Sequence, residues 1–265
     1  MRLRVVFANI YQGLHFAGEK DGEDVFFGFK PQLYGELFKN LNPDILCLAE
    51  MPFDTEDGQG QFITMLQDEL GFASHESYVS NKSWIVEGKF YGSAIFSKHK
   101  IVDYAVTTLP NPKLEVIRSD GSHWVMHDKA LQKAVISIGQ KRLNVFNLHY
   151  FPFHHFGRSL MEPEFAVIRQ QLADLVNPSK GEISLVTGDF NNKAVKLDAA
   201  FPELLATGIF TEAIEYNRLE KEKYYQGDGI QVDHILFSSG LKRILAEVED
   251  NYSDHPTLIA DFEVE

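Results

Sequence analysis

Six apolar segments of this sequence carry, at or near a boundary, side chains that can bind a cation or move a proton. Each such group alone is explained by a turn or by a solvated strand end. Six in equivalent positions indicate a shared site, because strand ends are where α/β proteins gather their ligands. The groups are Asn9, Glu50, His149, the pair Asp189 and Asn191, Asp233, and the pair Asp254 and His255.

The types of these residues suit two kinds of chemistry. Carboxylate and amide oxygens are the ligands that a hard divalent cation such as Mg²⁺ or Mn²⁺ prefers. Imidazoles beside such a cation suit proton transfer near neutral pH. The sequence therefore predicts a cation site with acid–base groups next to it.

Apolar periodicity predicts the elements that position these groups. Helices are expected over residues 31–40, 61–70 and 164–176. Strands are expected over residues 3–8, 44–49, 78–86, 92–97, 130–138, 142–148, 184–187, 231–237 and 256–263. Helices separate some strands and short loops join others, so we expect an α/β (α+β) fold of mixed sheets with helices on the outer faces. No repeat or linker divides the sequence, and residues 1–265 are expected to form a single domain.

Composition limits the classes of function. The chain has 265 residues and a net charge of -13, which opposes broad binding to nucleic acid because such binding needs a basic face. The single cysteine, Cys47, has no disulfide partner within the chain. The first residues lack the apolar region of a signal peptide, and no segment has the length of a membrane span. We therefore expect a cytoplasmic protein without a membrane span.

Seven short segments, in order along almost the whole chain, are similar to the motifs of one known family. They are ANIYQG around Asn9, DILCLAEM around Glu50, YGSAIFS around Tyr91, FNLHY around His149, TGDFNN around Asp189, VDHILF around Asp233, and SDHP at Asp254 and His255. By these segments the chain resembles the endonuclease/exonuclease/phosphatase superfamily. The resemblance implies a four-layer sandwich, in which two mixed β-sheets pack face to face with helices on both outer faces. It also implies hydrolysis of phosphate esters with Mg²⁺ or Mn²⁺ as cofactor.

The resemblance implies a role for each matched residue around the phosphate. Glu50 is expected to be the main metal ligand, with Asn9 beside it. Asp254 is expected to act on the metal directly or through water. Asp189 is expected to orient the attacking water, and Asn191 to donate to a phosphoryl oxygen.

The imidazoles receive the proton-transfer roles by the same resemblance. His255 is expected to be the general base, and Asp233 to hold it in the right tautomer as a carboxylate does in a triad. His149 is expected to donate to the phosphoryl oxygens or to assist the leaving group. Whether Asp189 or His255 takes the proton of the water stays open at this point.

Residues 149–165, HYFPFHHFGRSLMEPEF, have two interpretations. They form either a packed loop with phenylalanines in the core and histidines in solvent, or a substrate wall. In the second case Phe153 and His154 contact the substrate and Arg158 reaches a phosphate. Tyr91 is a further candidate for substrate contact, although packing explains it as well. A zinc site made by the three histidines of this segment lacks a fourth ligand.

The function favoured by these observations is hydrolysis of a phosphodiester or phosphomonoester by in-line attack of an activated water. The substrate class is open between a small molecule, a lipid head group and a nucleic acid. A nuclease acting on DNA or RNA is one alternative, which a basic patch beside the site would favour. In the apurinic endonuclease branch of the family a tyrosine usually stands at the position of His149. A non-catalytic binding protein that keeps the fold is the other alternative, and it is disfavoured because none of the matched positions is substituted.

Overall fold

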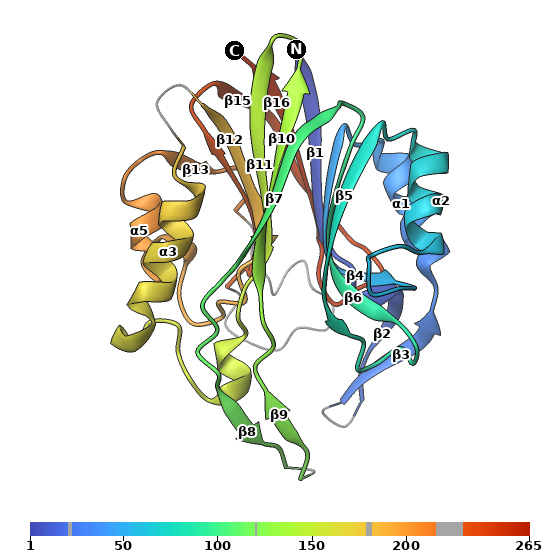
Figure 1. The fold of residues 1–265 in the computed structure, drawn as a ribbon, viewed down its shortest axis with the longest axis vertical. Helices are drawn as coiled ribbons and strands as arrows, with labels where there is room; N and C mark the ends of the chain where they lie inside the picture. Colours follow the sequence, from blue (N-terminus) through green and yellow to red (C-terminus); the bar gives the residue numbers. More distant parts are fainter. Residues whose placement is uncertain (21–22, 120, 179–181, 216–229) are drawn as a thin grey trace.

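Two six-stranded β-sheets form the centre of the molecule (Figure 1). The computed structural model describes residues 1–20, 23–119, 121–178, 182–215 and 230–265. The first sheet has the strand order β15 (Leu241–Glu249), β16 (Thr257–Val264), β1 (Arg2–Asn9), β4 (Ile45–Phe53), β6 (Phe90–Ser97) and β5 (Ser74–Lys82). The second sheet has the order β13 (Phe210–Glu212), β14 (Asp233–Ser238), β12 (Ile183–Asp189), β11 (Lys141–His149), β10 (Ala130–Ile138) and β7 (Ile101–Thr108).

Both sheets are mixed, as the sequence predicts. In the first sheet β1 runs parallel to β4, and in the second β11 runs parallel to β12. The other neighbouring strands pair antiparallel. The central strands read as nearly continuous apolar runs because layers cover both of their faces; all nine residues of β4 are buried. Parallel central strands bring their carboxyl ends to one edge of each sheet.

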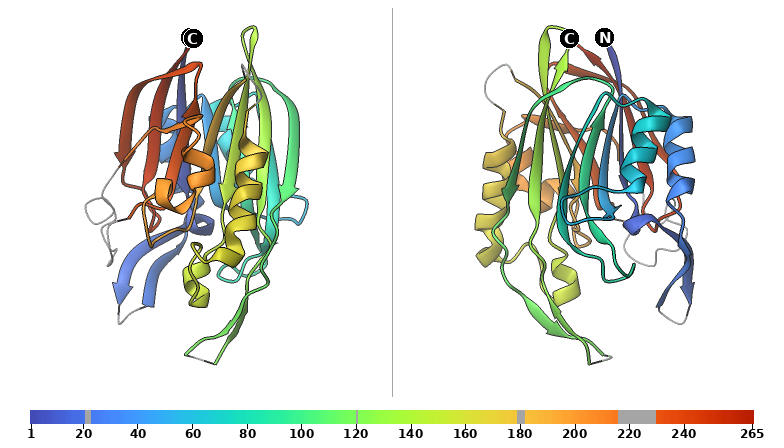
Figure 2. Two further views of the ribbon diagram at one scale, coloured as in Figure 1. Left: turned by 90° about the vertical axis from the view of Figure 1, so that its left-hand side faces the viewer. Right: turned by 45° about the vertical axis from the view of Figure 1, so that its right-hand side comes forward.

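Helices cover the outer face of each sheet (Figure 1, Figure 2). The first sheet is covered by α1 (Pro31–Leu41) and α2 (Gln61–Leu70), and the second by α3 (Ala166–Val176), α4 (Leu197–Ala200) and α5 (Pro202–Leu205). Pro31 starts α1, where its fixed φ suits the first turn. Gly71 ends α2 with a φ of +67°, a left-handed conformation that favours glycine.

Three hydrophobic cores separate the four layers. The core between the sheets contains Phe7, Cys47 and Ile95 of the first sheet with Val145, Leu185 and Ile235 of the second. Phe38 and Leu66 belong to the core between the first sheet and its helices. Leu172 and Phe201 belong to the core on the other side. This arrangement confirms the four-layer sandwich.

Asn147 makes a polar connection between the two sheets within the apolar layer. From β11 its Nδ2 donates to the carbonyl of Leu48 on β4, at 3.0 Å, and to Gln132 Oε1 on β10, at 3.2 Å. Its Oδ1 accepts a hydrogen bond from Thr187 Oγ1 at 3.2 Å. Moving the sheets apart would leave this buried amide without hydrogen-bond partners, which costs free energy. The amide therefore fixes the two sheets relative to each other, close to the strand ends that carry the site.

Two β-ribbons project from the sandwich (Figure 1, Figure 2). One is formed by β2 (Leu14–Lys20) and β3 (Glu23–Phe29), which follow β1 after the short 3-10 turn η1 (Tyr11–Gly13). The other, here called the β8–β9 arm, is formed by β8 (Glu115–Ile117) and β9 (His123–Val125). In the described residues, no helix combines the length and the apolar character needed to cross a membrane.

Some elements differ from those that the sequence predicts. The strand expected over residues 78–86 lies instead at Ser74–Lys82, because the chain turns at Ser83, whose Oγ accepts hydrogen bonds from the backbone N–H groups of Ile85 and Val86. The helix expected from residue 164 begins at Ala166, after a 3-10 turn at Pro163–Phe165 (η3). The strands β7 and β15 and both ribbons were not expected. β7 and β15 are edge strands with mostly exposed or half-exposed side chains, so they lack the continuous apolar run of the central strands.

Candidate active site

The register of the second sheet aligns three of the expected catalytic residues in one row. His149, at the end of β11, pairs with Asp189 at the end of the parallel strand β12. Asp189 in turn pairs with Asp233 at the start of the antiparallel strand β14. Side chains of neighbouring strands in register lie on the same face of a sheet. The row therefore faces the first sheet across the end of the sandwich.

The first sheet contributes Asn9 and Glu50 to the same place. Asn9 ends β1 next to Ala49 of β4. Its Nδ2 donates to Glu50 Oε1 and to Asp189 Oδ2, both at 3.1 Å. His149 Nε2 lies 3.8 Å from each of the same two carboxylate oxygens. Residues from both sheets thus form one cluster, as the sequence predicts.

Glu50 is held in this cluster by an irregular backbone. The pairing of β4 with β6 shifts between Leu48 and Met51, and Glu50 has a φ of +50°. Non-glycine residues with this φ are uncommon and concentrate at functional sites. The carboxylate is buried, and its Oε2 has no hydrogen-bond partner among the described residues. Burial raises the pKa of Glu50 to about 7, although the hydrogen bond from Asn9 opposes the rise.

His255 and Asp233 form a carboxylate–imidazole pair beside the cluster. His255 lies in the segment before β16, and its Nδ1 is 2.8 Å from Asp233 Oδ2. Its Nε2 is 3.9 Å from Asp189 Oδ2 and 3.8 Å from Asp254 Oδ2. Burial alone lowers the pKa of His255, but the negative charges of Asp233, Asp254 and Asp189 outweigh burial and hold that pKa well above its ordinary value.

The two imidazoles also act on Asp189. Burial alone raises the pKa of this carboxyl, but the positive charge of His255, the proximity of the His149 imidazole and the hydrogen bonds that Asp189 accepts hold its pKa below the usual range. One of these hydrogen bonds comes from the backbone N–H of Asn191, at 2.8 Å from Asp189 Oδ1. Asn191 has a φ of +52°, and its side chain donates to the carbonyl of Tyr150 at 3.0 Å. The turn after β12 thus brings Asn191 next to Asp189, with Phe190 buried between them.

Lys129 is a member of the site that the sequence reasoning missed. Its side chain enters from the residue before β10 and is only 6% exposed. Its ammonium has no hydrogen bond or ion pair with the described residues, while the charges of Glu50 and Asp189 act on it. Burial lowers its pKa to about 8. A lysine directly before an apolar strand was the signal that could have found it, since the other site residues also stand at strand boundaries.

Burial also changes the pKa of His149. Desolvation and the positive charge of Lys129 lower it to about 3. The imidazole is therefore neutral near pH 7, so that it can donate one N–H without carrying charge.

Three of the expected substrate contacts lie in other surroundings. Tyr91 is 1% exposed, and its hydroxyl bonds His127 Nδ1 at 2.8 Å. Phe153, 2% exposed, belongs to the short 3-10 turn η2 (Phe153–Phe156) and packs in the core against Phe165. Arg158 forms ion pairs with two nearby carboxylates, those of Glu162 and Glu164. Packing and ion pairing therefore account for all three side chains.

His154 lies closer to the site than the other expected substrate contacts. Both of its ring nitrogens are enclosed and have no hydrogen-bond partner among the described residues, so this side chain is not in solvent as the packed-loop interpretation has it. Desolvation and the charges of His155 and Lys193 lower its pKa to about 3, and the charge of Asp189 opposes this. A zinc site of three histidines does not form. In the described part of the chain, the one group of three with ligand atoms within 4.8 Å of each other is Asp189, Asp233 and His255.

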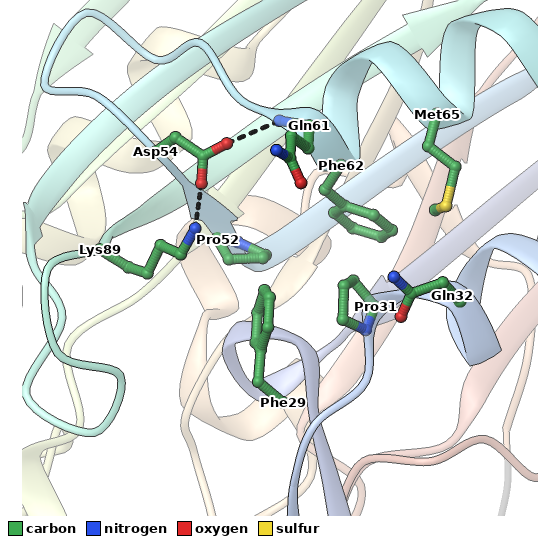
Figure 3. Close-up of a pocket in the computed structure, with 9 residues that line it drawn as sticks. All are labelled: Phe29, Pro31, Gln32, Pro52, Asp54, Gln61, Phe62, Met65 and Lys89. Carbon is green, nitrogen blue, oxygen red and sulfur yellow. Dashed lines mark hydrogen bonds and ion pairs between the residues drawn. The ribbon is translucent and has the colours of Figure 1, made fainter.

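A cavity of about 270 Å³ lies away from these residues (Figure 3). It opens beside the first turns of α1 and α2, and its walls are mainly the side chains Phe29, Pro31, Pro52, Phe62 and Met65. At one end, Asp54 pairs with Lys89 and accepts a hydrogen bond from the backbone N–H of Gln61 at 2.7 Å (Figure 3). The two charged groups of the cavity are therefore already paired with each other.

Comparison with protein families agrees with the fold. The model of the endonuclease/exonuclease/phosphatase family matches residues 29–255. The chain belongs to this family. No curated protein sequence matches the chain. The family assignment therefore rests on the family model.

Solved structures of the endonuclease/exonuclease/phosphatase family share the fold at low sequence identity. A Beutenbergia cavernae member has a TM-score of 0.72 at 15% identity, covering 99% of this chain and 72% of its own. The human nocturnin catalytic domain with bound sulfate has a TM-score of 0.64 at 18% identity, covering 100% and 94%. A Bacteroides thetaiotaomicron mannosyl-6-phosphatase has a TM-score of 0.58 at 14% identity, covering 98% and 99%. At these identities the likeness concerns the fold.

Proposed function

We propose that the protein is a divalent-metal-dependent hydrolase of phosphate esters, in which water attacks the phosphorus in line. The observation that carries this proposal is the buried carboxylate of Glu50, with one oxygen unpartnered among the described residues, facing a carboxylate–imidazole pair across Asp189. An orphaned carboxylate oxygen fits a cation, and a paired imidazole fits proton transfer. Membership of the family supports the same chemistry.

The residues present fit Mg²⁺ or Mn²⁺. Glu50 and Asn9 would hold the ion, with Asp254 acting directly or through water. The donor set is oxygen-rich, as hard cations require, and a cation beside Glu50 offsets the burial that raises the pKa of this carboxyl. When bound, the metal supplies positive charge that stabilises the charge developing on the phosphoryl oxygens. Asp189, Asp233 and His255 are assigned to the proton rather than to the metal, because His255 Nδ1 and Asp233 already share a hydrogen bond.

The proton of the attacking water goes to His255 in this proposal. Asp233 holds Nδ1 of the ring, which leaves Nε2 on the side of Asp189. Asp189 orients the water by accepting one of its hydrogen bonds. Because the pKa of His255 is raised and that of Asp189 is lowered, His255 is the stronger base of the two, and it accepts the proton of the water from its neutral form.

Three donors remain for the phosphoryl oxygens. His149 is neutral and donates an N–H, Asn191 offers its amide, and Lys129 offers a buried ammonium next to Glu50 and Asp189. Donors fixed in a desolvated site stabilise developing negative charge strongly, because they need no reorganisation during the reaction. The same three groups would help to bind the substrate.

Hydrolysis of bis(p-nitrophenyl) phosphate with Mn²⁺ tests the proposal. We expect turnover that EDTA abolishes and that Asp189→Asn lowers by at least about 10²-fold, the range expected when the attacking water loses its orientation. The exposed carboxylate variant Asp103→Asn, on the edge strand β7, is the matched control and keeps the activity. Lack of turnover by a folded protein that binds no Mn²⁺ would contradict the proposal and favour a non-catalytic role.

A further inference from the structure

The β8–β9 arm presents an arginine that is held in place by an aromatic ring, without a carboxylate partner among the described residues. In the paired strands, Val116 lies opposite Trp124. Because side chains alternate between the faces of a strand, Arg118 lies on the same face as these two residues. Its guanidinium carbon lies 3.4 Å from the centre of the Trp124 ring. Among the described residues, Arg118 makes no ion pair.

This face of the arm is turned toward the candidate active site. The Trp124 ring contacts His155 edge-on, with centroids 6.1 Å apart. His155 stacks obliquely on His154, with centroids 4.1 Å apart. Both figures with whole-molecule views show the arm beside the short turn η2 that carries these histidines (Figure 1, Figure 2). The opposite face of the arm holds Ile117, 66% exposed, and does not contact the site.

The charges on this side of the site are positive, although the chain as a whole is acidic. Desolvation and the positive charges of Lys193 and Arg118 lower the pKa of His155 to about 4, and Lys129 contributes in the same direction. The carboxylate of Asp189 also acts on His155. The arm, the histidine pair and the cluster are therefore within electrostatic reach of one another. Arg118, Lys193 and Lys129 thus place positive charge around His155, and Asp189 of the cluster lies within the same reach.

We infer that Arg118, Lys193 and His155 form a subsite for a second phosphate group, and that the substrate is a small phosphate ester that carries one. This inference rests on the proposed function, because the subsite is defined by its position next to the scissile phosphate. A guanidinium stacked on an aromatic ring is pre-organised, and its free N–H edges match the bidentate geometry of a phosphate. The net charge of -13 favours a small substrate over a polynucleotide, since the acidic protein repels the parts of a long anionic chain that lie beyond the site.

Competition against bis(p-nitrophenyl) phosphate hydrolysis tests the subsite. The two competitors are propane-1,3-diyl bisphosphate and propyl phosphate, measured at constant free Mn²⁺. We expect the bisphosphate to inhibit at a concentration about tenfold lower, the effect of one charge-assisted contact under partial screening. In Arg118→Gln this ratio falls to about one or two. Arg142→Gln, an exposed arginine at the far end of β11, is the matched control and keeps the ratio.

The possible outcomes separate the inference from the function on which it rests. Hydrolysis with equal inhibition by the two competitors would overturn the subsite and leave the proposed function standing. A single-stranded decanucleotide that inhibits more strongly than the bisphosphate, through Arg118, would overturn the assignment of a small substrate. If no hydrolysis is found, binding of the two competitors is measured instead, by calorimetric titration in EDTA. Tighter bisphosphate binding that requires Arg118 would then support the subsite, and equal binding would refute it.

Discussion

The pair of Asp233 and His255 has a close structural match on the same strand, which permits a controlled test of its role. Residues 233 and 234 are neighbours on β14 and point to opposite faces of the sheet. On one face Asp233 bonds His255 Nδ1 at 2.8 Å, and on the other His234 Nδ1 lies 2.9 Å from Glu212 Oε2. Both are buried carboxylate–imidazole pairs. Asp233→Asn and Glu212→Gln therefore make the same chemical change, but only the first lies in the candidate active site.

The expected loss in Asp233→Asn follows from the burial and separation of the pair. Two unit charges about 4 Å apart interact by ~4 kcal/mol at an effective dielectric constant of about 20. The imidazolium formed when His255 takes a proton loses this stabilisation, which corresponds to a rate lower by about 10³-fold. The asparagine amide can also donate to Nδ1 and so favour the wrong tautomer, which adds to the loss.

The assay is Mn²⁺-dependent hydrolysis of bis(p-nitrophenyl) phosphate, accompanied by Mn²⁺ titration and thermal unfolding of each variant. We expect Glu212→Gln to keep hydrolysis within about threefold of the parent, since its pair faces away from the cluster. Asp233→Asn should bind Mn²⁺ as the parent does. Activity of Asp233→Asn within threefold of the parent would refute the proton-transfer role. A marked loss of Mn²⁺ affinity in this variant would instead place the metal between Asp189, Asp233 and His255.

Three further predictions concern stability and metal binding. Glu50→Gln should weaken Mn²⁺ binding. In metal-free protein at pH 8 it should also raise the free energy of unfolding by about 3 kcal/mol, because burial raises the pKa of this carboxyl to about 7 and its ionisation then destabilises the folded protein. This gain should vanish at pH 4, and denaturant unfolding that shows no gain at pH 8 would contradict the burial argument. The carboxyl of Asp261 is buried and accepts a hydrogen bond from Arg4 at 2.8 Å, and its pKa is lowered. Its contribution to the free energy of unfolding is therefore complete above the unfolded pKa of about 4 and is lost as the pH falls through the folded pKa. Asp261→Asn should be less stable than the parent at pH 7, and a difference that persists unchanged at pH 2 would count against this. Gly188→Ala should destabilise the protein by about 1–3 kcal/mol, because the added Cβ would lie 2.5 Å from the carbonyl oxygen of Leu148. If the variant unfolds at the same temperature as the parent, the neighbouring strand can move aside and this prediction is wrong.

The sequence was sufficient to predict the central strands and most of the cluster. Asn9, Glu50, His149 and Asp189 each stand at or near the carboxyl end of a central strand, and such strands are recognisable as continuous apolar runs. Once two parallel pairs bring their ends together, the polar groups must meet. The site was thus predictable from local signals and a resemblance, and the register pairs in the structure account for the outcome.

Other features depend on side-chain partners rather than on apolar runs. Lys129 belongs to the site because Glu50 and Asp189 come from other strands, and its position directly before an apolar strand does not by itself indicate those partners. Arg158 was expected to reach a phosphate, but Glu162 and Glu164 neutralise it in the folded chain. The spacing of four residues between Arg158 and Glu162 was an available signal, since such pairs interact when the chain turns helically. Edge strands such as β15 escape prediction because exposed strands carry no apolar run.

The chain order of the strands has a consequence for biosynthesis. Residues 101–238 supply the whole second sheet, whereas the first sheet combines β1, β4, β5 and β6 with β15 and β16 from beyond that insertion. During synthesis, the edge of β1 that pairs with β16 stays unpaired until residues 257–264 have left the ribosome. An open apolar strand edge invites wrong pairing. His255, directly before β16, arrives with the strand that closes the sheet, so a nascent chain gains its proposed base only when this edge is covered.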